Sequence, residues 1–174
     1  MEFCLRPLSA SDGRDIYDML QGIAGDSNLF TNPVKDMPYA DYEKWLEKHE
    51  GYSRGEHMPN WMVPETTFWL YCDGVPIGIG RIRHFLNDKL ERDGGHIGYA
   101  IAEQYRSRGC GYEILRLLLQ ECKKLKIDIV QLRANMSNTA SNKIILRSGG
   151  ILHKTVENRN IYLIDLRKQY SKFI

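Results

Sequence analysis

The sequence predicts one α/β domain, an α+β arrangement in which a mixed, mostly antiparallel central sheet is flanked by helices. Three observations predict it. Strand-like and helix-like stretches alternate along the whole chain, the helix-like stretches place apolar side chains at helical spacing, and no linker or repeat divides the 174 residues. A chain of this length supplies one hydrophobic core, so residues 1–174 are expected to form a single domain.

The first third of the chain predicts one strand and two helices. Pro7 ends a short strand, and Ser9 or Ser11 can cap the helix that follows. A second helix comes after a loop rich in Gly, Asn and Pro, and it places aromatic and leucine side chains on one face. The expected elements are a strand at 3–6, a helix that ends near 23, loops at 25–38 and 51–64, and a helix at 39–49.

The middle third is rich in residues that favour strands. Asp73-Gly74 is a two-residue hairpin signal between two runs of β-branched and aromatic residues. Gly78 and Gly80 weaken the second of these runs or produce a bulge in it. The expected elements are strands at 67–72, 75–85 and 96–101, with a loop at 87–94.

The last third begins with the clearest helix of the chain, and Gly149-Gly150 ends a second one. The side chains that predict the buried face of the first helix are Ile114, Leu117, Leu118, Cys122 and Leu125. The expected elements are helices at 109–126 and 138–147, and strands at 127–134, 151–156 and 161–166, the last two joined by a turn at 157–160.

Composition excludes several classes of function. The net charge is only +2 and basic residues alternate with acidic ones, so neither nucleic acid nor an acidic membrane is an expected partner. No apolar run approaches the roughly 20 residues of a membrane span, and the first residues do not resemble a secretory signal. The four cysteines show no CxxC spacing, which predicts reduced thiols in a cytoplasmic protein and no metal site.

The segment that joins the strand at 96–101 to the long helix has the composition of a phosphate site. Gly109 and Gly111 open the helix, where backbone N–H groups are unpaired and the helix dipole favours an anion. Arg106 and Arg108 add guanidinium groups suited to phosphate oxygens. A Walker loop would need Gly-Lys-Ser/Thr here, and a Rossmann fingerprint would need glycine in place of Ile114, so both are excluded.

The pattern Arg106-x-x-Gly109-x-Gly111 after a strand resembles motif A of the GNAT (Gcn5-related N-acetyltransferase) superfamily. The Asn138-x-x-Ser141 helix start, the later glycine pair and the order of elements are also similar, so the resemblance covers essentially the whole chain. It implies a sheet splayed at the strand before the motif, and acetyl-CoA as cosubstrate. By resemblance, the coenzyme-binding residues are Ile101, Ala102, Arg106, Ser107, Arg108, Gly109, Cys110, Gly111, Tyr112, Asn138 and Ser141.

The resemblance also implies where catalytic groups are expected. His96 falls where relatives often carry a general base, and its ordinary pKa near 6.5 suits that role; it can equally be a structural histidine, and His84 is a second candidate. A backbone N–H near Ile101 is the expected donor to the carbonyl oxygen. The tyrosine that serves as general acid in many relatives is replaced by Ile145, so Cys110, Tyr99 or water would have to serve.

The sequence therefore predicts direct transfer of an acetyl group from acetyl-CoA to a primary amine of unknown identity. The alternative is a non-catalytic acyl-CoA-binding or sensor module. The loops at 25–65 and 84–94 are expected to form the acceptor wall. Within the superfamily the chain resembles a subgroup of small bacterial acetyltransferases, which implies a bacterial source. Dimers are common among such relatives, so a homodimer is a possible assembly. Six aromatic side chains can line the wall or belong to ordinary core and lid packing: Phe30, Tyr39, Trp45, Trp61, Phe68 and Trp69. Four acidic side chains can attract a cationic amine or form a solvated helix face: Glu43, Glu47, Glu50 and Glu56.

Overall fold

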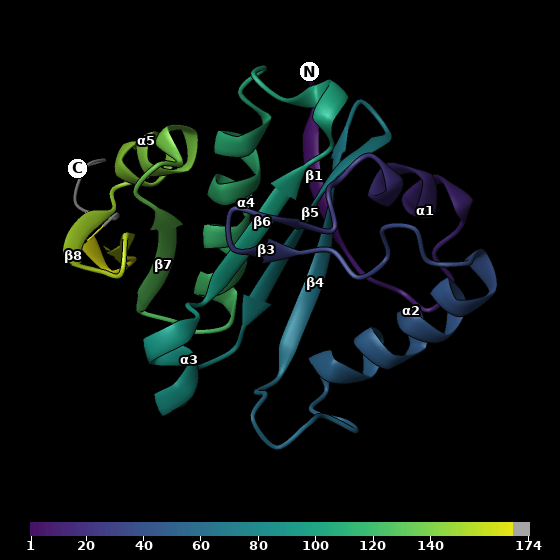
Figure 1. The fold of residues 1–174 in the computed structure, drawn as a ribbon, viewed down its shortest axis with the longest axis horizontal. Coiled ribbons are helices and arrows are strands. Elements are labelled where there is room, and N and C mark those ends of the chain that lie inside the picture. The colour runs from purple at the N-terminus through teal and green to yellow at the C-terminus, as the bar shows by residue number, and fades with distance from the viewer. Residues whose placement is uncertain (169–174) are drawn as a thin grey trace.

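The computed structural model describes residues 1–168, and strands and helices alternate along them as the sequence predicts (Figure 1). The elements are β1 (Phe3–Pro7), α1 (Arg14–Gln21), β2 (Asp26–Ser27), β3 (Phe30–Thr31), α2 (Tyr39–Ser53), β4 (Glu65–Cys72), β5 (Val75–Arg83), α3 (Asp88–Asp93), β6 (Ile97–Ile101), the 3-10 helix η1 (Glu103–Tyr105), α4 (Cys110–Lys124), β7 (Ile129–Asn135), α5 (Thr139–Arg147), β8 (Ile151–Val156) and β9 (Arg159–Asp165).

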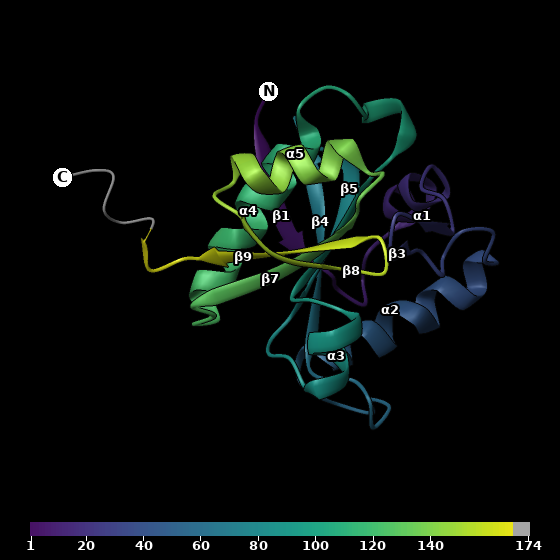
Figure 2. The same cartoon turned by 60° about the vertical axis from the view of Figure 1, so that its left-hand side comes forward.

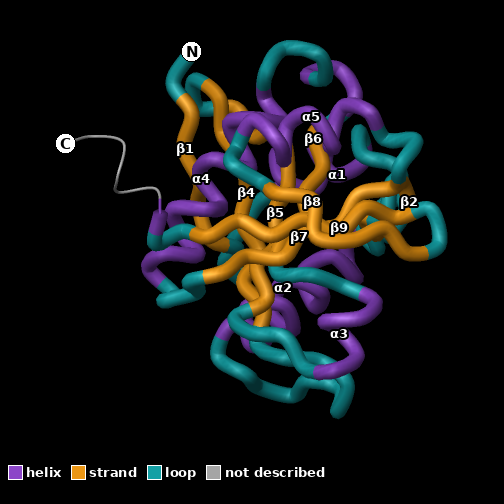
Figure 3. The backbone as a smooth tube through the Cα atoms, turned by 90° about the vertical axis from the view of Figure 1, so that its left-hand side faces the viewer, coloured by secondary structure: helices purple, strands orange, loops and turns teal. Residues whose placement is uncertain are grey.

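Two larger sheets form the centre of the molecule, one in the order β1-β4-β5-β6 and one in the order β7-β9-β8. Every strand ladder within residues 1–168 is antiparallel. The two sheets are joined just before β6, where the His96 N–H donates to the Gln131 carbonyl at 2.8 Å. Beyond that point β6 and β7 share no ladder in the described residues, so the sheet is splayed at β6, as the resemblance implied (Figures 1 and 3).

Helices cover both faces of the four-stranded sheet. α1 and α2 pack on one face around the buried Trp69 and Ile79, and α4 packs on the other around Leu70 and Ile82 (Figures 1 and 2). The period-2 alternation of β4 and β5 decides this, because successive side chains point to opposite faces. The α/β fold class is confirmed.

Several boundaries differ from the sequence prediction. The expected loop at 25–38 contains the short hairpin β2–β3, the expected loop at 87–94 contains α3, and η1 precedes α4. The α1 helix begins after Gly13 without a side-chain cap, so the prediction of a Ser9 or Ser11 cap was wrong. The Asp12 carboxylate instead accepts the Ser9 N–H and closes a turn over residues 9–12, so the helix begins only after that turn.

The buried face of α4 also differs. Leu115 and Leu119 are buried, whereas Leu117 is only partly buried and Leu125 is 37% exposed. The helix carries leucine or isoleucine on more than one side, so spacing alone did not select the face. Contacts with β1, β5 and β6 select it.

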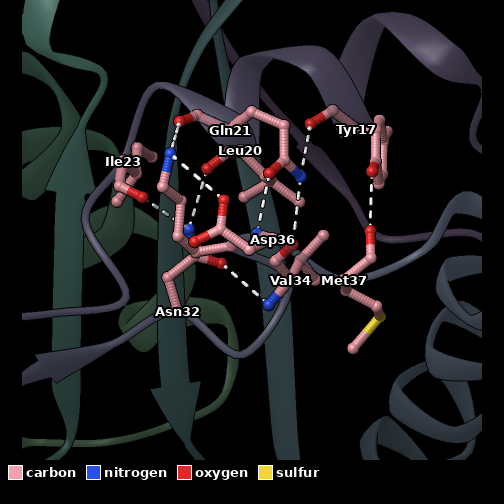
Figure 4. Close-up of polar contacts among 9 residues, drawn as sticks. Tyr17, Leu20, Gln21, Ile23, Asn32, Val34, Asp36 and Met37 are labelled. Atoms are coloured by element: carbon pink, nitrogen blue, oxygen red, sulfur yellow. Dashed lines mark hydrogen bonds and ion pairs between the residues drawn. The ribbon is translucent and has the colours of Figure 1, made fainter.

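A polar network ties the segment that follows β3 to the end of α1 (Figure 4). The buried Asn32 amide donates to the carbonyls of Leu20 and Ile23 at 2.8 and 3.0 Å, which satisfies groups that a helix end leaves unpaired. Gln21 donates to the Val34 carbonyl and Tyr17 to the Met37 carbonyl. The network holds β3 in place, and β3 forms one side of the cavity described below.

None of the helices in residues 1–168 is long and apolar enough to cross a membrane.

Candidate functional site

The start of α4 exposes an array of unpaired amides. Ser107 has φ 59° and Gly109 has φ 82°, and these left-handed residues turn the chain into the helix. No acceptor within the described residues faces the N–H groups of Arg108, Gly109 and Gly111. A side-chain methyl built on Gly109 would meet no protein atom within 4 Å, so the space above these amides is open. The geometry suits a phosphate group.

The predicted basic residues lie beside this array, with different tasks. Arg108 is exposed, as is Ser107. Arg106 is exposed too, but its Nε donates to the Ile101 carbonyl at 3.0 Å and fixes its guanidinium near the end of β6. The Tyr112 amide is taken by the Gly109 carbonyl, and its ring lies under the Arg147 guanidinium at 4.1 Å. Tyr112 therefore provides no free amide, and its ring packs against α5.

The β6 strand has one open edge. The Ala102 N–H donates to the Ile77 carbonyl of β5, so the backbone groups of alternate residues point to β5 and those of Ile97, Tyr99 and Ile101 point to the gap beside β7. Among the described residues, the N–H groups of Tyr99 and Ile101 have no acceptor. Ala102 offers no free backbone group, because its carbonyl accepts the Tyr105 N–H. Ile101, unlike Ala102, can pair with an amide-containing ligand chain.

A cavity of about 610 Å³ opens at the splay. Its wall combines the β2–β3 hairpin, α2, the loop before β4, and residues of β5, β6, β7 and α5. Of the six aromatic side chains singled out from the sequence, Phe30, Trp45 and Trp61 line it, while Trp69 is fully buried in the core. The acidic side chains at 43, 47, 50 and 56 do not line it, and the solvated interpretation of that helix face holds for Glu43 and Glu47.

Three polar side chains meet where the cavity passes between β6 and α5. Asn138 caps α5: its Oδ1 accepts the Ser141 N–H at 3.2 Å, and its Nδ2 donates to the Ser141 Oγ at 2.9 Å. Tyr99 points to the same place from β6. Its hydroxyl is buried without a hydrogen bond of acceptable geometry, and burial raises its pKa, an effect that the nearby Ser141 partly offsets. Ile145, where relatives carry tyrosine, also lines the cavity.

His96 lines the cavity, but its ring is engaged in joining the sheets. The Gln131 N–H donates to Nδ1 at 2.9 Å, so the neutral ring carries its proton on Nε2. Burial, with Arg83 nearby, lowers the pKa of His96 to about 4. The ring is neutral near pH 7 and has no free lone pair in this tautomer. His84 lies outside the cavity, where its Nε2 contacts the Thr66 Oγ1 at 2.8 Å.

A further histidine in the cavity was missed by the sequence reasoning. His49 stacks on Trp45 with ring centroids 4.1 Å apart, and its Nδ1 lies 2.9 Å from the Trp45 carbonyl. A carbonyl only accepts, so Nδ1 carries the proton and Nε2 is left as an acceptor. Burial lowers the pKa of His49 to about 4. Its aromatic neighbours are the only sequence signal, and they do not distinguish a site from a core.

Cys110 is predicted from the sequence as a coenzyme-binding residue and a candidate general acid. It is the first residue of α4, its side chain is buried in the core, and burial raises the pKa of its thiol. The side chain therefore packs behind the turn, and its contact with the coenzyme stays a prediction. No group of three or more His, Cys, Asp or Glu side chains in residues 1–168 can hold a metal ion.

Comparison with known proteins identifies the family. The model of the acetyltransferase (GNAT) domain matches residues 2–151. No curated protein matches the sequence significantly. Among solved structures, a probable acetyltransferase is 17% identical with a TM-score of 0.69, and the match covers 95% of this chain and 94% of the other.

Two further similar structures are of acetyltransferases with specific names. The N-acetyltransferase PseH of Campylobacter jejuni, in complex with acetyl coenzyme A, has 10% identity and a TM-score of 0.61, covering 95% and 99% of the two chains. The ribosomal L7/L12 alpha-N-protein acetyltransferase RimL has 13% identity and a TM-score of 0.65, covering 94% and 90%. At these identities the likeness concerns the fold.

The chain belongs to the GNAT acetyltransferase family. It is an acetyl-CoA-dependent N-acetyltransferase whose acceptor is an amine that none of these comparisons identifies.

Proposed function

We propose that this protein transfers the acetyl group directly from acetyl-CoA to a primary amine held in the cavity between β6 and β7. One observation carries the proposal: the open edge of β6 leads from the unpaired amides at the start of α4 to the cavity. A pyrophosphate bound at the helix start and an extended arm along β6 would bring a thioester to the splay. Amine and thioester then meet without a covalent acetyl-enzyme.

The residues of the α4 start would bind the coenzyme. The amides of Arg108, Gly109 and Gly111 provide hydrogen bonds to phosphate oxygens, and the exposed guanidinium groups of Arg106 and Arg108 add charge. Ser107 shapes this turn through its left-handed backbone, Cys110 packs behind it, and Tyr112 follows in the first turn of α4. Along β6, the Ile101 backbone would pair with the arm, while Ala102 holds the strand against β5.

Backbone N–H groups of β6 and the Tyr99 hydroxyl would assist acetyl transfer. The N–H groups on the open edge near Ile101 can stabilise the carbonyl oxygen as it gains charge. Tyr99 would donate its proton to the departing thiolate. It keeps that proton at neutral pH because burial raises its pKa, and it faces the part of the cavity lined by Asn138, Ser141 and Ile145. The tyrosine is thus supplied by β6, where relatives supply one from the helix.

The base role predicted for His96 stays a prediction. Its occupied Nδ1 favours a positioning role in which the ring keeps β6 and β7 together at the base of the splay. The Nε2 of His49 is the imidazole acceptor that the cavity offers, directly or through water. A low pKa makes it a weak base, so the acceptor must reach the site largely as the neutral amine.

The test is turnover, followed as release of free coenzyme A thiol with a panel of primary amines. Tyr99→Phe should reduce kcat by roughly 10- to 100-fold and leave the Kd for acetyl-CoA unchanged, because a hydroxyl used as general acid acts only in the transition state. Binding of acetyl-CoA without turnover by the intact protein across the panel would instead support the acyl-CoA-binding module. Loss of acetyl-CoA affinity in Tyr99→Phe would contradict the assigned role.

We also propose that the protein works in the bacterial cytoplasm and forms a homodimer. Four free cysteines within the described residues support a reducing compartment. The edge strand β8, exposed along its whole length and carrying Ile151, Leu152 and Val156, supports pairing with a second copy. Light scattering on the purified protein tests the dimer, and a monomer at micromolar concentration would contradict it.

A further inference from the structure

We propose that the acceptor of this enzyme is an amine whose molecule also carries a carboxylate or phosphate group. The inference rests on the proposed function, since it specifies the substrate class of the same cavity. It comes from the charges of the cavity wall.

Cationic side chains outnumber acidic ones around the cavity. Both histidines of the wall are neutral near pH 7, because burial lowers the pKa of each to about 4. The remaining charged groups are four basic side chains and two acidic ones. The basic side chains are Lys48, Arg81, Arg83 and Arg133, and the acidic side chains are Glu65 and Asp93. The chain as a whole is nearly neutral, so this excess is local.

Arg81 is the most confined of these cations. Its side chain is 17% exposed and lies over the Phe30 ring at 4.6 Å, and one Nη donates to the Thr31 carbonyl at 2.9 Å. Its Nε is buried without a hydrogen-bond partner in the described residues. A buried guanidinium with an unused donor is costly unless an anion faces it.

The nearest carboxylate does not balance this charge. Glu65, itself buried, lies between two guanidinium groups, 4.0 Å from the Nε of Arg81 and 3.5 Å from the Nε of Arg83, and makes a hydrogen bond of acceptable geometry to neither. One negative charge therefore serves two positive ones. Burial lowers the pKa of Arg81 and Arg83 acts in the same direction, while Glu65 raises that pKa and offsets only part of the effect. A second anion beside the two guanidinium groups would therefore stabilise the site.

Arg133 contributes a cation from the opposite sheet. It lies on β7, and its Nη2 donates to the Glu91 carbonyl at 3.2 Å while its Nε is buried without a partner in residues 1–168. Guanidinium groups from β5 and β7 thus line one cavity across the splay. Such groups recognise carboxylate and phosphate oxygens, often in pairs of hydrogen bonds.

The same charges favour the reactive form of the acceptor. A cationic environment lowers the pKa of a bound ammonium group, so the neutral amine is favoured without a strong base. An amine with no acidic group would meet net repulsion while it is protonated. An acidic group elsewhere in the molecule offsets that repulsion and fixes the orientation of the amine.

The test compares matched pairs of small peptides bound to the protein saturated with coenzyme A. Alanyl-aspartyl amide is compared with alanyl-asparaginyl amide, and alanyl-phosphoserine amide with alanyl-serine amide, by isothermal titration. We expect the acidic member of at least one pair to bind roughly 10- to 100-fold more tightly, the range of one or two charge-assisted hydrogen bonds. The pair that shows the larger difference identifies carboxylate or phosphate as the preferred group.

Arg81→Gln should remove most of this preference. The control is Arg92→Gln, which removes the same charge from the exposed surface of α3, outside the cavity. Because Arg81 also holds β3 in place, Arg133→Gln is tested beside it and should weaken the preference from the other wall. Retention of the full preference in both cavity variants would overturn the inference.

The affinity for acetyl-CoA, measured on the same preparations, separates the two proposals. Three results overturn the anionic acceptor alone if acetyl-CoA still binds. The two peptides of each pair bind with equal affinity, the uncharged peptide binds more tightly, or no peptide binds at millimolar concentration. Failure to bind acetyl-CoA overturns the proposed function and this inference with it. A drop in acetyl-CoA affinity in Arg81→Gln would assign the cation to the coenzyme instead.

Discussion

Gly109→Ala tests the coenzyme site at a single methyl group. Gly109 has φ 82°, and a methyl group built on it meets no protein atom within 4 Å. The substitution therefore causes backbone strain of about 1–2 kcal/mol and no clash with the protein. The added methyl lies in open space at the start of α4, next to the unpaired amides of the same turn. It would displace a phosphate from one or two of those amides, at about 1.5–3 kcal/mol for each charge-assisted hydrogen bond, or roughly 10- to 100-fold or more in Kd.

Gly74 provides a matched control. It has φ 81°, its built methyl also meets no protein atom within 4 Å, and it lies in the hairpin turn between β4 and β5. Gly74→Ala should cause the same backbone strain, so both variants should lower Tm by roughly 3–6 °C. Only Gly109→Ala should lose acetyl-CoA affinity in isothermal titration. Equal affinity of the two variants for acetyl-CoA would refute the assignment of the α4 start as the pyrophosphate site.

Three other expectations concern histidines and packing. His96→Gln should weaken the junction of the two sheets and lower Tm, while the pH dependence of kcat keeps its shape. Loss of the fall in kcat at low pH would restore the base role, because a general base is inactive once it is protonated. Folding lowers the pKa values of His49 and His96, so the unfolded chain binds more protons than the folded protein between about pH 4 and 6.5. The free energy of unfolding should be highest above about pH 6.5 and fall as the pH falls toward 4, by on the order of 1–2 kcal/mol for each ring after solvent screening. A free energy of unfolding that does not change with pH in denaturant titrations would contradict this. Gly80→Ala should cost about 1–3 kcal/mol, because its methyl would lie 2.7 Å from a leucine of α4, whereas Gly25→Ala, with no atom closer than 3.7 Å, should be tolerated; equal midpoints in urea would refute this.

Local parts of the site could be predicted because they are contiguous. The turn from Arg106 to Gly111 carries its glycines, its basic residues and its helix start within one segment, and the structure places them together. Asn138 and Ser141 likewise form a helix cap that three-residue spacing predicts. Their contacts with a coenzyme remain proposals.

Errors arose where tertiary contacts decide. Ser9 and Ser11 had the residue type of a helix cap, but the turn around Asp12 moved the helix start to Gly13. Leu117 and Leu125 had the helical spacing of a buried face, but the packing of α4 on the sheet buries Leu115 and Leu119 instead. In each case the local signal was present and a longer-range contact overrode it. For the helix start this contact is the Trp69 Nε1–H of β4, which donates to the Asp12 carboxylate, and for α4 it is the packing on the sheet.

The sequence by itself determined the α/β class, the family and the turn that can bind a phosphate, because these depend on residues that are neighbours along the chain. Only the tertiary structure decided the acceptor cavity. Its cations come from α2, β5 and β7, and Glu65 comes from β4, so their charges combine only after the two sheets splay at β6. Side chains so distant in sequence leave no local pattern, and their shared electrostatic environment exists only in the folded protein.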